Sequence, residues 1–215
     1  MLRWNRECSH VANELLERAI DTGDCEAIAE AIESSDGMSY RTADGVTCLG
    51  LATAAKFGSE GTLSRVECLL GLGAKVADER AKSGPGTSVH QAALNGHVET
   101  LQALLSADGR SALDTFDDLG RTPLMCAVQS RDRRCVEILV AAGASLDVRD
   151  EMLLGDTALI HAVRSRDLAL VEVLMKAGAN PDVRGWMQLS AHDRLDDLSD
   201  DAGLLVRMRV LLGQA

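Results

Sequence analysis

The chain has 215 residues, of which 46% are hydrophobic and 2% aromatic, and its formal net charge is −11. This charge argues against general nucleic-acid binding, because the neutralisation of phosphates requires clustered Lys and Arg side chains. No run approaches the roughly 20 apolar residues of a membrane span, and residues 1–18 lack the apolar stretch of a secretory signal. We expect no nucleic-acid or membrane partner, and a core built from Leu, Val, Ile and Ala.

The six cysteines include no CxxC pair, and several of them fall at positions where a core is expected. This usage is typical of a chain that keeps its thiols reduced. We therefore predict reduced and buried cysteines, and a cytoplasmic location.

The first third of the chain alternates short apolar runs with turns. Residues 1–12 are predicted to form a short lead helix or a frayed end. From 13 to 32, apolar residues recur at helical spacing on either side of Gly23. The segment 45–74 repeats this arrangement, but Thr47 and Val66 lie 19 positions apart, against 14 for Thr122 and Val136. Five residues are therefore inserted around 56–62. We expect Phe57 on a protruding loop, the alternative being an insertion without a role.

The third segment opens at Thr87 and carries His90 and His97. The turn before it, KSGPGT, holds Pro85 at the place where later segments have Gly. We expect a shortened or tilted turn there.

The clearest pattern is a repetition: residues 120–149, GRTPLMCAVQSRDRRCVEILVAAGASLDVR, recur at 155–184 as GDTALIHAVRSRDLALVEVLMKAGANPDVR. Self-similarity of this length indicates a stacked-repeat architecture. In the first copy Thr122 can cap a helix, Pro123 suits its first position, and Gly143 can end a second helix. Neither helix can bury its apolar stripe alone, so neighbouring copies must stack.

After Arg184 the pattern degrades. Residues 185–190 lead into a predicted first helix, and the apolar residues from Val206 to Leu212 predict a second. The acidic stretch Asp193–Asp201 between them is interpreted as a solvated loop.

The T-P-L-x-x-A run from Thr122 and the V-x-x-L-x-x-x-G-A run from Val136 resemble the ankyrin repeat, which has two antiparallel helices and a β-turn finger. The resemblance implies an all-α ankyrin-repeat solenoid of about six helix-turn-helix units, with β-turn fingers and atypical capping units. One domain would cover residues 1–215, with units at 13–44 (N-terminal cap), 45–82, 83–117, 118–152, 153–185 and 186–215 (C-terminal cap).

The resemblance also implies roles for single residues. His90 would tie the turn of its unit through hydrogen bonds, and His97 would order the loop between its helices. The family prefers Gly where Arg131 and Arg166 stand. Each arginine would therefore cost on the order of 1 kcal/mol if its position keeps a positive φ.

No catalytic or metal-binding constellation is present in the sequence. The five histidines have no H-E-x-x-H or C-x-x-C companion, and neither a glycine-rich phosphate loop after a strand nor a G-x-S-x-G elbow occurs. We predict no enzymatic activity, no cofactor and no metal.

The aromatic residues lie outside the predicted helix cores, and Tyr40, Phe116 and Trp186 fall in predicted fingers. Exposed aromatic, Met and Arg side chains have the composition of binding hot spots, and the resemblance implies docking on the concave side, formed by fingers and first helices. An alternative is that these side chains pack against adjacent fingers. The predicted partner-binding residues are Tyr40, Arg41, Phe116, Leu119, Arg121, Gln129, Met152, Leu153, Leu154, Arg164, Trp186 and Met187.

We therefore expect a non-catalytic protein–protein interaction module that is a monomer on its own. Its negative charge favours a basic partner through electrostatic steering. The resemblance leaves other roles open: an immunity or inhibitor protein that neutralises a cognate toxin or enzyme, an effector, or a stable accessory subunit of an enzyme complex.

Overall fold

The computed structural model describes residues 2–35, 37–42, 45–53, 58–78, 86–149, 155–198 and 200–213, with the backbone alone for 2–10, 38, 59, 78 and 197–198. Within these ranges the regular elements are all helical, apart from one isolated β-bridge between Arg41 and Thr47. Among the described helices, none combines the length and apolarity needed to cross a bilayer.

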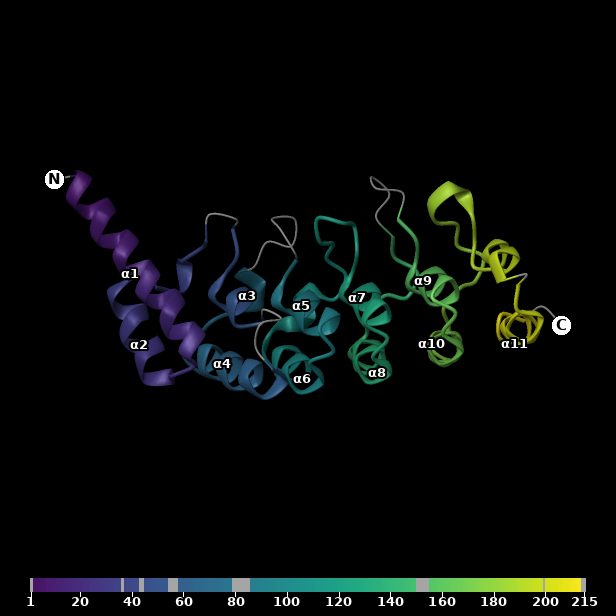
Figure 1. Cartoon of the computed structure of the whole chain (residues 1–215), viewed down its shortest axis with the longest axis horizontal. Helices are drawn as coiled ribbons and strands as arrows, with labels where there is room; N and C mark the ends of the chain where they lie inside the picture. Colours follow the sequence, from purple (N-terminus) through teal and green to yellow (C-terminus); the bar gives the residue numbers. More distant parts are fainter. Residues whose placement is uncertain are drawn as a thin grey trace.

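The helices follow one another in pairs along the long axis of the molecule (Figure 1). The α-helices are α1 (Leu2–Thr22), α2 (Cys25–Ser34), α3 (Cys48–Ala52), α4 (Ser59–Gly71), α5 (Ser88–Leu94), α6 (Val98–Ala107), α7 (Pro123–Ser130), α8 (Arg133–Ala142), α9 (Ala158–Arg164), α10 (Leu168–Lys176) and α11 (Ala202–Leu211). The 3-10 helices are η1 (Gly37–Ser39), η2 (Val76–Asp78), η3 (Gly109–Ala112), η4 (Trp186–Gln188) and η5 (Asp193–Leu198).

The helix boundaries follow the local chemistry predicted from the sequence. Thr122 is the N-cap of α7, where its hydroxyl accepts a hydrogen bond from the amide of Met125 (3.4 Å), and Pro123 takes the first helical position. Thr157 caps α9 in the same way, with the amide of Ile160 as donor (3.3 Å). Gly143 ends α8 with φ +96°, a conformation that side chains rarely adopt.

One cluster of buried apolar side chains runs through the whole stack, from Leu16 in α1 to Leu212 beyond α11. Second helices contribute fully buried leucines such as Leu104, Leu139 and Leu174, and first helices contribute alanines and valines together with leucines such as Leu124 and Leu159. The predicted continuous core of small and aliphatic residues is therefore confirmed.

The two arginines between helices keep the positive φ on which their strain depends, at 58° for Arg131 and 59° for Arg166. Each side chain reaches the next inter-helix loop. Arg131 Nη2 donates to the carbonyl of Ser165 (3.1 Å), and Arg166 forms an ion pair with Asp200 (2.9 Å). These contacts link each strained inter-helix loop to the inter-helix loop of the next unit.

Three sequence predictions need correction. The lead segment is neither a separate helix nor frayed, because α1 is continuous over 21 residues. The insertion after α3 is partly absorbed into α4, whose 13 residues begin at Ser59; Phe57 and the turn around Pro85 lie outside the described residues. The acidic stretch after Ser190 forms η5, in which Leu195 is buried and adds to the core.

The prediction of reduced and buried cysteines is wrong for one pair. Cys25 and Cys68 form a disulfide, and Cys25 is exposed. Cys48, Cys126 and Cys135 are free and buried, as predicted; the side chain of Cys8 lies outside the described set. The bonded pair was not recognisable because 43 positions separate the two residues, and only the packing of α2 against α4 brings them together.

Candidate protein-binding surface

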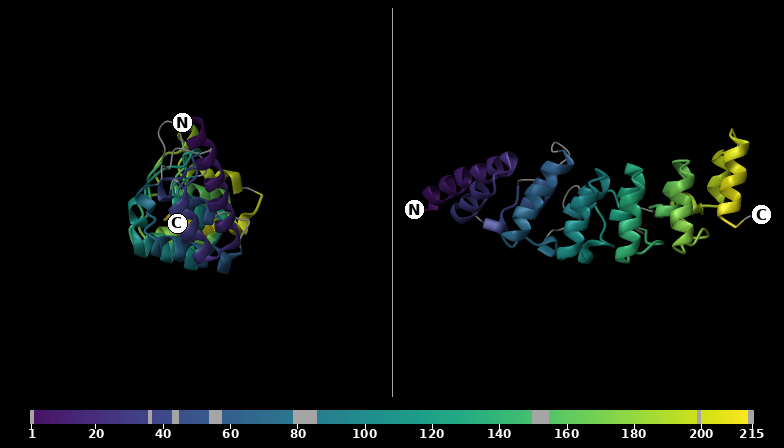
Figure 2. Two further views of the ribbon diagram at one scale, coloured as in Figure 1. Left: turned by 90° about the vertical axis from the view of Figure 1, so that its left-hand side faces the viewer. Right: turned by 90° about the horizontal axis from the view of Figure 1, so that it is seen from below.

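The described parts of the turns between units lie on one side of the stack, next to the first helices α3, α5, α7 and α9, whereas the second helices α4, α6, α8 and α10 line the opposite side (Figure 1). Seen from below, the pairs form a gently bowed row (Figure 2). The structure therefore separates a finger and first-helix face from a second-helix face, as the sequence predicted.

The finger before α7 is organised by a buried carboxylate. Asp117, 2% exposed, accepts hydrogen bonds from the amides of Leu119 (3.0 Å) and Arg121 (2.8 Å) and forms an ion pair with the guanidinium of Arg121 (2.7 Å). Arg121 Nη1 also donates to Gln129 in α7 (2.6 Å). This network fixes the finger to its first helix and leaves the Leu119 side chain 64% exposed at the tip.

A second buried carboxylate joins α9 to the following finger. Asp156, 4% exposed, forms an ion pair with Arg164 of α9 (2.7 Å) and accepts a hydrogen bond from the amide of Trp186 (2.8 Å). Gly185 allows this approach, because a Cβ there would lie 2.9 Å from the Cα of Asp156. The Trp186 finger is thereby held to the unit that precedes it.

The tip of that finger is a strained turn that presents two apolar side chains. Met187 and Gln188 both have positive φ, 59° and 60°, although neither is glycine. The amide of Leu189 donates to the carbonyl of Trp186 (3.3 Å), and Arg184 Nη1 donates to the carbonyl of Gln188 (2.8 Å). Such strain is on the order of 1–3 kcal/mol per residue, persists only where the surroundings impose it, and clusters at functional sites.

Trp186 and Met187 are 49% and 63% exposed on this turn. The guanidinium of Arg194 lies 5.9 Å from the centre of the Trp186 ring, within the range of a cation–π contact. The indole is thus held in place without being covered.

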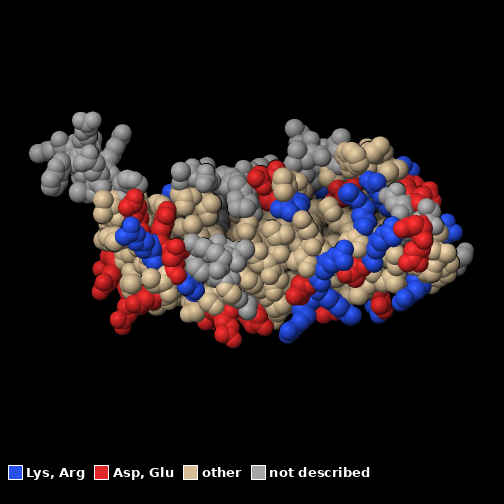
Figure 3. Space-filling view, viewed as in Figure 1, with Lys and Arg blue, Asp and Glu red and all other residues tan. Residues whose placement is uncertain are grey.

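The predicted binding residues divide by exposure. Leu119, Gln129, Arg164, Trp186 and Met187 are exposed, whereas Phe116 and Arg121 are half-buried. Figure 3 shows, on the face that it views, most arginines and lysines over the later units, and carboxylates over both the earlier and the later units. Met152, Leu153 and Leu154 lie outside the described residues.

The expected exposure of Tyr40 is wrong. Its ring is 9% exposed and belongs to the core, and its hydroxyl donates to the carboxylate of Glu17 in α1. Arg41 is half-buried, and its Nη1 donates to the carbonyl of Tyr40 (2.9 Å). The hydrogen bond to Glu17 thus ties the Tyr40 side chain to the continuous helix α1.

The two carboxylates that organise the face were not singled out from the sequence. Asp117 stands five positions before Thr122, in a D-x-x-G-x-T run that could have identified it. Asp156 has no such signal, because its role depends on the close approach of Gly185 from the next unit.

His90 has the structural role that the resemblance implied. It is fully buried, its Nδ1 accepts from the amide of Thr87 (3.1 Å), and its Nε2 lies 3.1 Å from the carbonyls of Thr115 and of Arg121. Burial lowers the pKa of His90 below its usual value, which keeps the ring neutral. His97 is buried at the N-cap of α6. In the described part of the chain, no group of three or more His, Cys, Asp or Glu is arranged to hold a metal ion.

Helix pairs stacked on one core, with fixed fingers along one face, define a repeat scaffold. The family model described as ankyrin repeats (3 copies) matches residues 51–150 and 90–185. The chain belongs to the ankyrin repeat family, whose repeats are generally protein–protein interaction modules and typically non-catalytic.

Solved structures agree with this assignment. The ankyrin repeat domain of Bcl-3, a member of the IkappaB protein family, superposes with a TM-score of 0.75 at 26% identity, covering 94% of this chain and 86% of that one. An ankyrin repeat domain from Acinetobacter baumannii AYE superposes with a TM-score of 0.74 at 24% identity, covering 92% of this chain and 95% of that one.

Curated relatives match only a part of the chain. Inversin from Danio rerio is 43% identical over 65 residues, or 30% of this chain, and human inversin is 42% identical over 71 residues, or 33%. The human transient receptor potential cation channel subfamily A member 1 is 32% identical over 62 residues, or 29%. The matched stretch makes up 6% of the length of each relative.

Proposed function

We propose that this chain binds a partner protein through its finger and first-helix face, with Leu119, Trp186 and Met187 as apolar anchors. The strained turn at Met187 and Gln188 is the observation that carries this proposal. A turn with two non-glycine residues at positive φ costs stability, and the exposed Trp186 and Met187 side chains gain little from folding in return. A rigid turn does, however, preorganise these side chains, which reduces the entropy lost when a partner binds.

The polar residues beside the anchors support the same face. Arg164 is half-exposed while a buried carboxylate fixes its position, and Gln129 is exposed on α7 beside Arg121. Arginine is one of the residue types that are enriched at binding hot spots. We include Met152, Leu153 and Leu154 in the proposed face because they form an apolar run in a predicted finger. The net charge of −11 supports a basic partner.

The unit division at 13–44, 45–82, 83–117, 118–152, 153–185 and 186–215 is part of the same proposal. It is supported by the helix bounds, because each of the four ranges from 45 to 185 holds one α-helix pair, the first range holds the end of α1 and all of α2, and the last holds η4, η5 and α11. A cytoplasmic location and a monomeric free state also remain predictions.

Replacing Leu119 and Trp186 together by Ser is expected to raise the Kd of the partner complex about 100-fold or more, because each removes an exposed apolar anchor. The partner is first captured from source cells on the immobilised wild-type chain, identified by mass spectrometry and purified, and its Kd is then measured by titration calorimetry. The melting temperature is expected to change by less than about 2 °C, since surface substitutions stay within roughly 0.5 kcal/mol.

Val206→Ser with Val210→Ser is the matched control. These valines are 59% and 63% exposed, similar to Leu119 and Trp186, but they belong to α11, which lies in the row of second helices. This variant should bind like the wild type. An unchanged Kd for the Leu119/Trp186 variant would refute the proposed face, and a drop of many degrees in its melting temperature would show that the anchors are core residues. A captured toxin would identify an immunity protein, and a partner in constant stoichiometry in native extract would identify an accessory subunit.

A further inference from the structure

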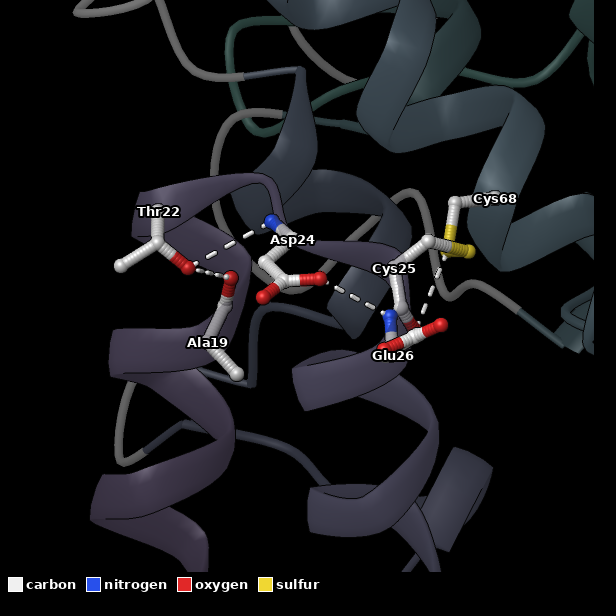
Figure 4. The surroundings of a disulfide bond; sticks show 6 residues. All are labelled: Ala19, Thr22, Asp24, Cys25, Glu26 and Cys68. Carbon is white, nitrogen blue, oxygen red and sulfur yellow. Dashed lines mark hydrogen bonds between the residues drawn. A yellow bond between two sulfur atoms is a disulfide. The ribbon is translucent and has the colours of Figure 1, made fainter.

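Helix α4 is fastened to the turn between α1 and α2 by a disulfide. Cys25, the first residue of α2, is bonded to Cys68 of α4, with the two Cα atoms 5.8 Å apart (Figure 4). Asp24, which precedes Cys25, caps α2 through a hydrogen bond from the amide of Glu26 (3.1 Å). The bond therefore joins the start of α2 to the next helix pair.

An arginine fastens the same turn. Arg65 lies one helical turn before Cys68 on α4, so the two side chains share a face. Its Nε and Nη2 donate to the carbonyls of Ile20 and Asp21 at the end of α1, both at 2.7 Å. Gly23, with φ +76°, allows the close approach, because a Cβ there would meet the guanidinium carbon at 2.9 Å. The contact between the two units thus has one covalent and one non-covalent part.

The bonded cysteines differ from the free ones in their access to solvent. Cys25 is exposed and Cys68 half-buried, whereas Cys48, Cys126 and Cys135 are buried. Burial raises the pKa of the Cys48 thiol to about 11, and those of Cys126 and Cys135 to about 12. Because the thiolate is the reactive form, these three thiols are inert at neutral pH. Among the described cysteines, the Cys25–Cys68 pair is the one suited to thiol–disulfide exchange.

We propose that the Cys25–Cys68 bond is a reversible redox clamp that controls how readily the N-terminal helix pair α1–α2 opens from α4. Exposed disulfides are the labile ones, and in reducing compartments such bonds are typically transient and redox-sensing. The proposal concerns regulation and does not depend on the identity of the partner protein.

The chemistry is two thiol–disulfide exchanges with a small thiol such as glutathione. Its thiolate attacks the sulfur of the exposed residue Cys25, the protein S–S bond breaks, and Cys68 leaves as a thiolate that takes up a proton. A second glutathione thiolate then attacks the mixed disulfide and releases Cys25. Two electrons pass from two glutathione thiols to the protein, which gains two thiols, and one molecule of glutathione disulfide forms.

Reduction should loosen the pair α1–α2 without unfolding the chain. Among the described helices, α1 and α2 pack mainly against one other pair, α3–α4, so they should open more readily than pairs that are held on both sides. Arg65 and the buried side chains of Leu16, Ile20 and Ile28 still hold α1–α2 in place after reduction. Tyr40, buried and hydrogen-bonded to Glu17 of α1, would become accessible whenever the pair opens.

Hydrogen exchange read by mass spectrometry on the full wild-type chain tests the clamp. Oxidised protein should show a Cys25–Cys68 cross-link in peptide maps, and a glutathione buffer with the reduced form in large excess should remove it. The amides of residues 16–34 should then exchange about tenfold faster, while those of α7 to α10 keep their rates. Adding glutathione disulfide should restore the slow exchange.

Cys25→Ser with Cys68→Ser is the matched control, and it should exchange like the reduced wild type in both buffers. The main comparison is between oxidised and reduced wild-type protein, which carries no substitution. The test therefore remains valid even if the Cys25/Cys68 variant folds poorly. Equal exchange in the oxidised and reduced states would overturn the proposal. A Cys25–Cys68 bond that survives the reducing buffer would also overturn it, because the bond would then be a static structural disulfide. So would a cross-link between other cysteines in the oxidised protein.

Discussion

Leu139→Ala is expected to lower the free energy of unfolding by about 2–5 kcal/mol. Leu139 is fully buried in α8, and α8 packs against α6, α7 and α10. The shorter side chain leaves a cavity between stacked helices that the neighbouring units cannot close without losing their own contacts. Denaturant titration followed by helical circular dichroism measures the loss.

Leu119→Ala is the control for this prediction, because it removes the same atoms from a side chain that is 64% exposed. Its expected effect is within about 0.5 kcal/mol. A Leu139→Ala protein as stable as the wild type would mean that the helices stack in a different register.

His90→Ala is expected to cost about 3–5 kcal/mol, because it combines a cavity with the loss of buried hydrogen bonds. The ring joins the amide of Thr87, at the start of its own unit, to the carbonyls of Thr115 and Arg121 in the next finger. Its removal should therefore destabilise two units together. Denaturant titration, with the exposed position Gln102→Ala on α6 as the control, measures the difference.

Acid provides a second measurement on the same residue. Because burial lowers the folded-state pKa of His90 below the unfolded value of about 6.5, the unfolded chain binds the proton more readily. The stabilisation by the neutral ring is complete above about pH 6.5 and declines as the pH falls toward the folded-state pKa, by at most about 1.4 kcal/mol per pH unit. The stability difference between wild type and His90→Ala should shrink between pH 7 and 5. A difference that does not change with pH would contradict a neutral buried ring.

The parts of the fold that depend on local chemistry could be predicted. Thr122, Pro123 and Gly143 define helix ends through hydrogen bonds and backbone angles within a few residues, and the repetition of these signals indicated stacking. A positive φ at Arg131 was one of two possibilities, because the resemblance places Gly there and an altered loop was the alternative; the structure has the positive φ. The structure has all of these features, because the interactions concerned are short-range in sequence.

The parts that depend on contacts between units could not be predicted. The burial of Tyr40 requires Glu17 and a continuous α1, and the Cys25–Cys68 bond requires the packing of α2 on α4. For the candidate surface, composition correctly indicated exposed side chains at Leu119, Trp186 and Met187. It could not reveal that Asp156 and Gly185 hold the Trp186 finger in place, since neither residue belongs to a recognisable motif.

Hydrogen exchange on the wild-type chain, alone and with its purified partner, tests most directly whether a shared core supports a binding face of fingers. In the free chain the amides of α7 to α10 should exchange slowest. The partner should slow exchange at residues 114–121 and 184–189, while the exposed second-helix side around α8 and α11 keeps its rates. Protection confined to the second helices, with unchanged fingers, would contradict this account.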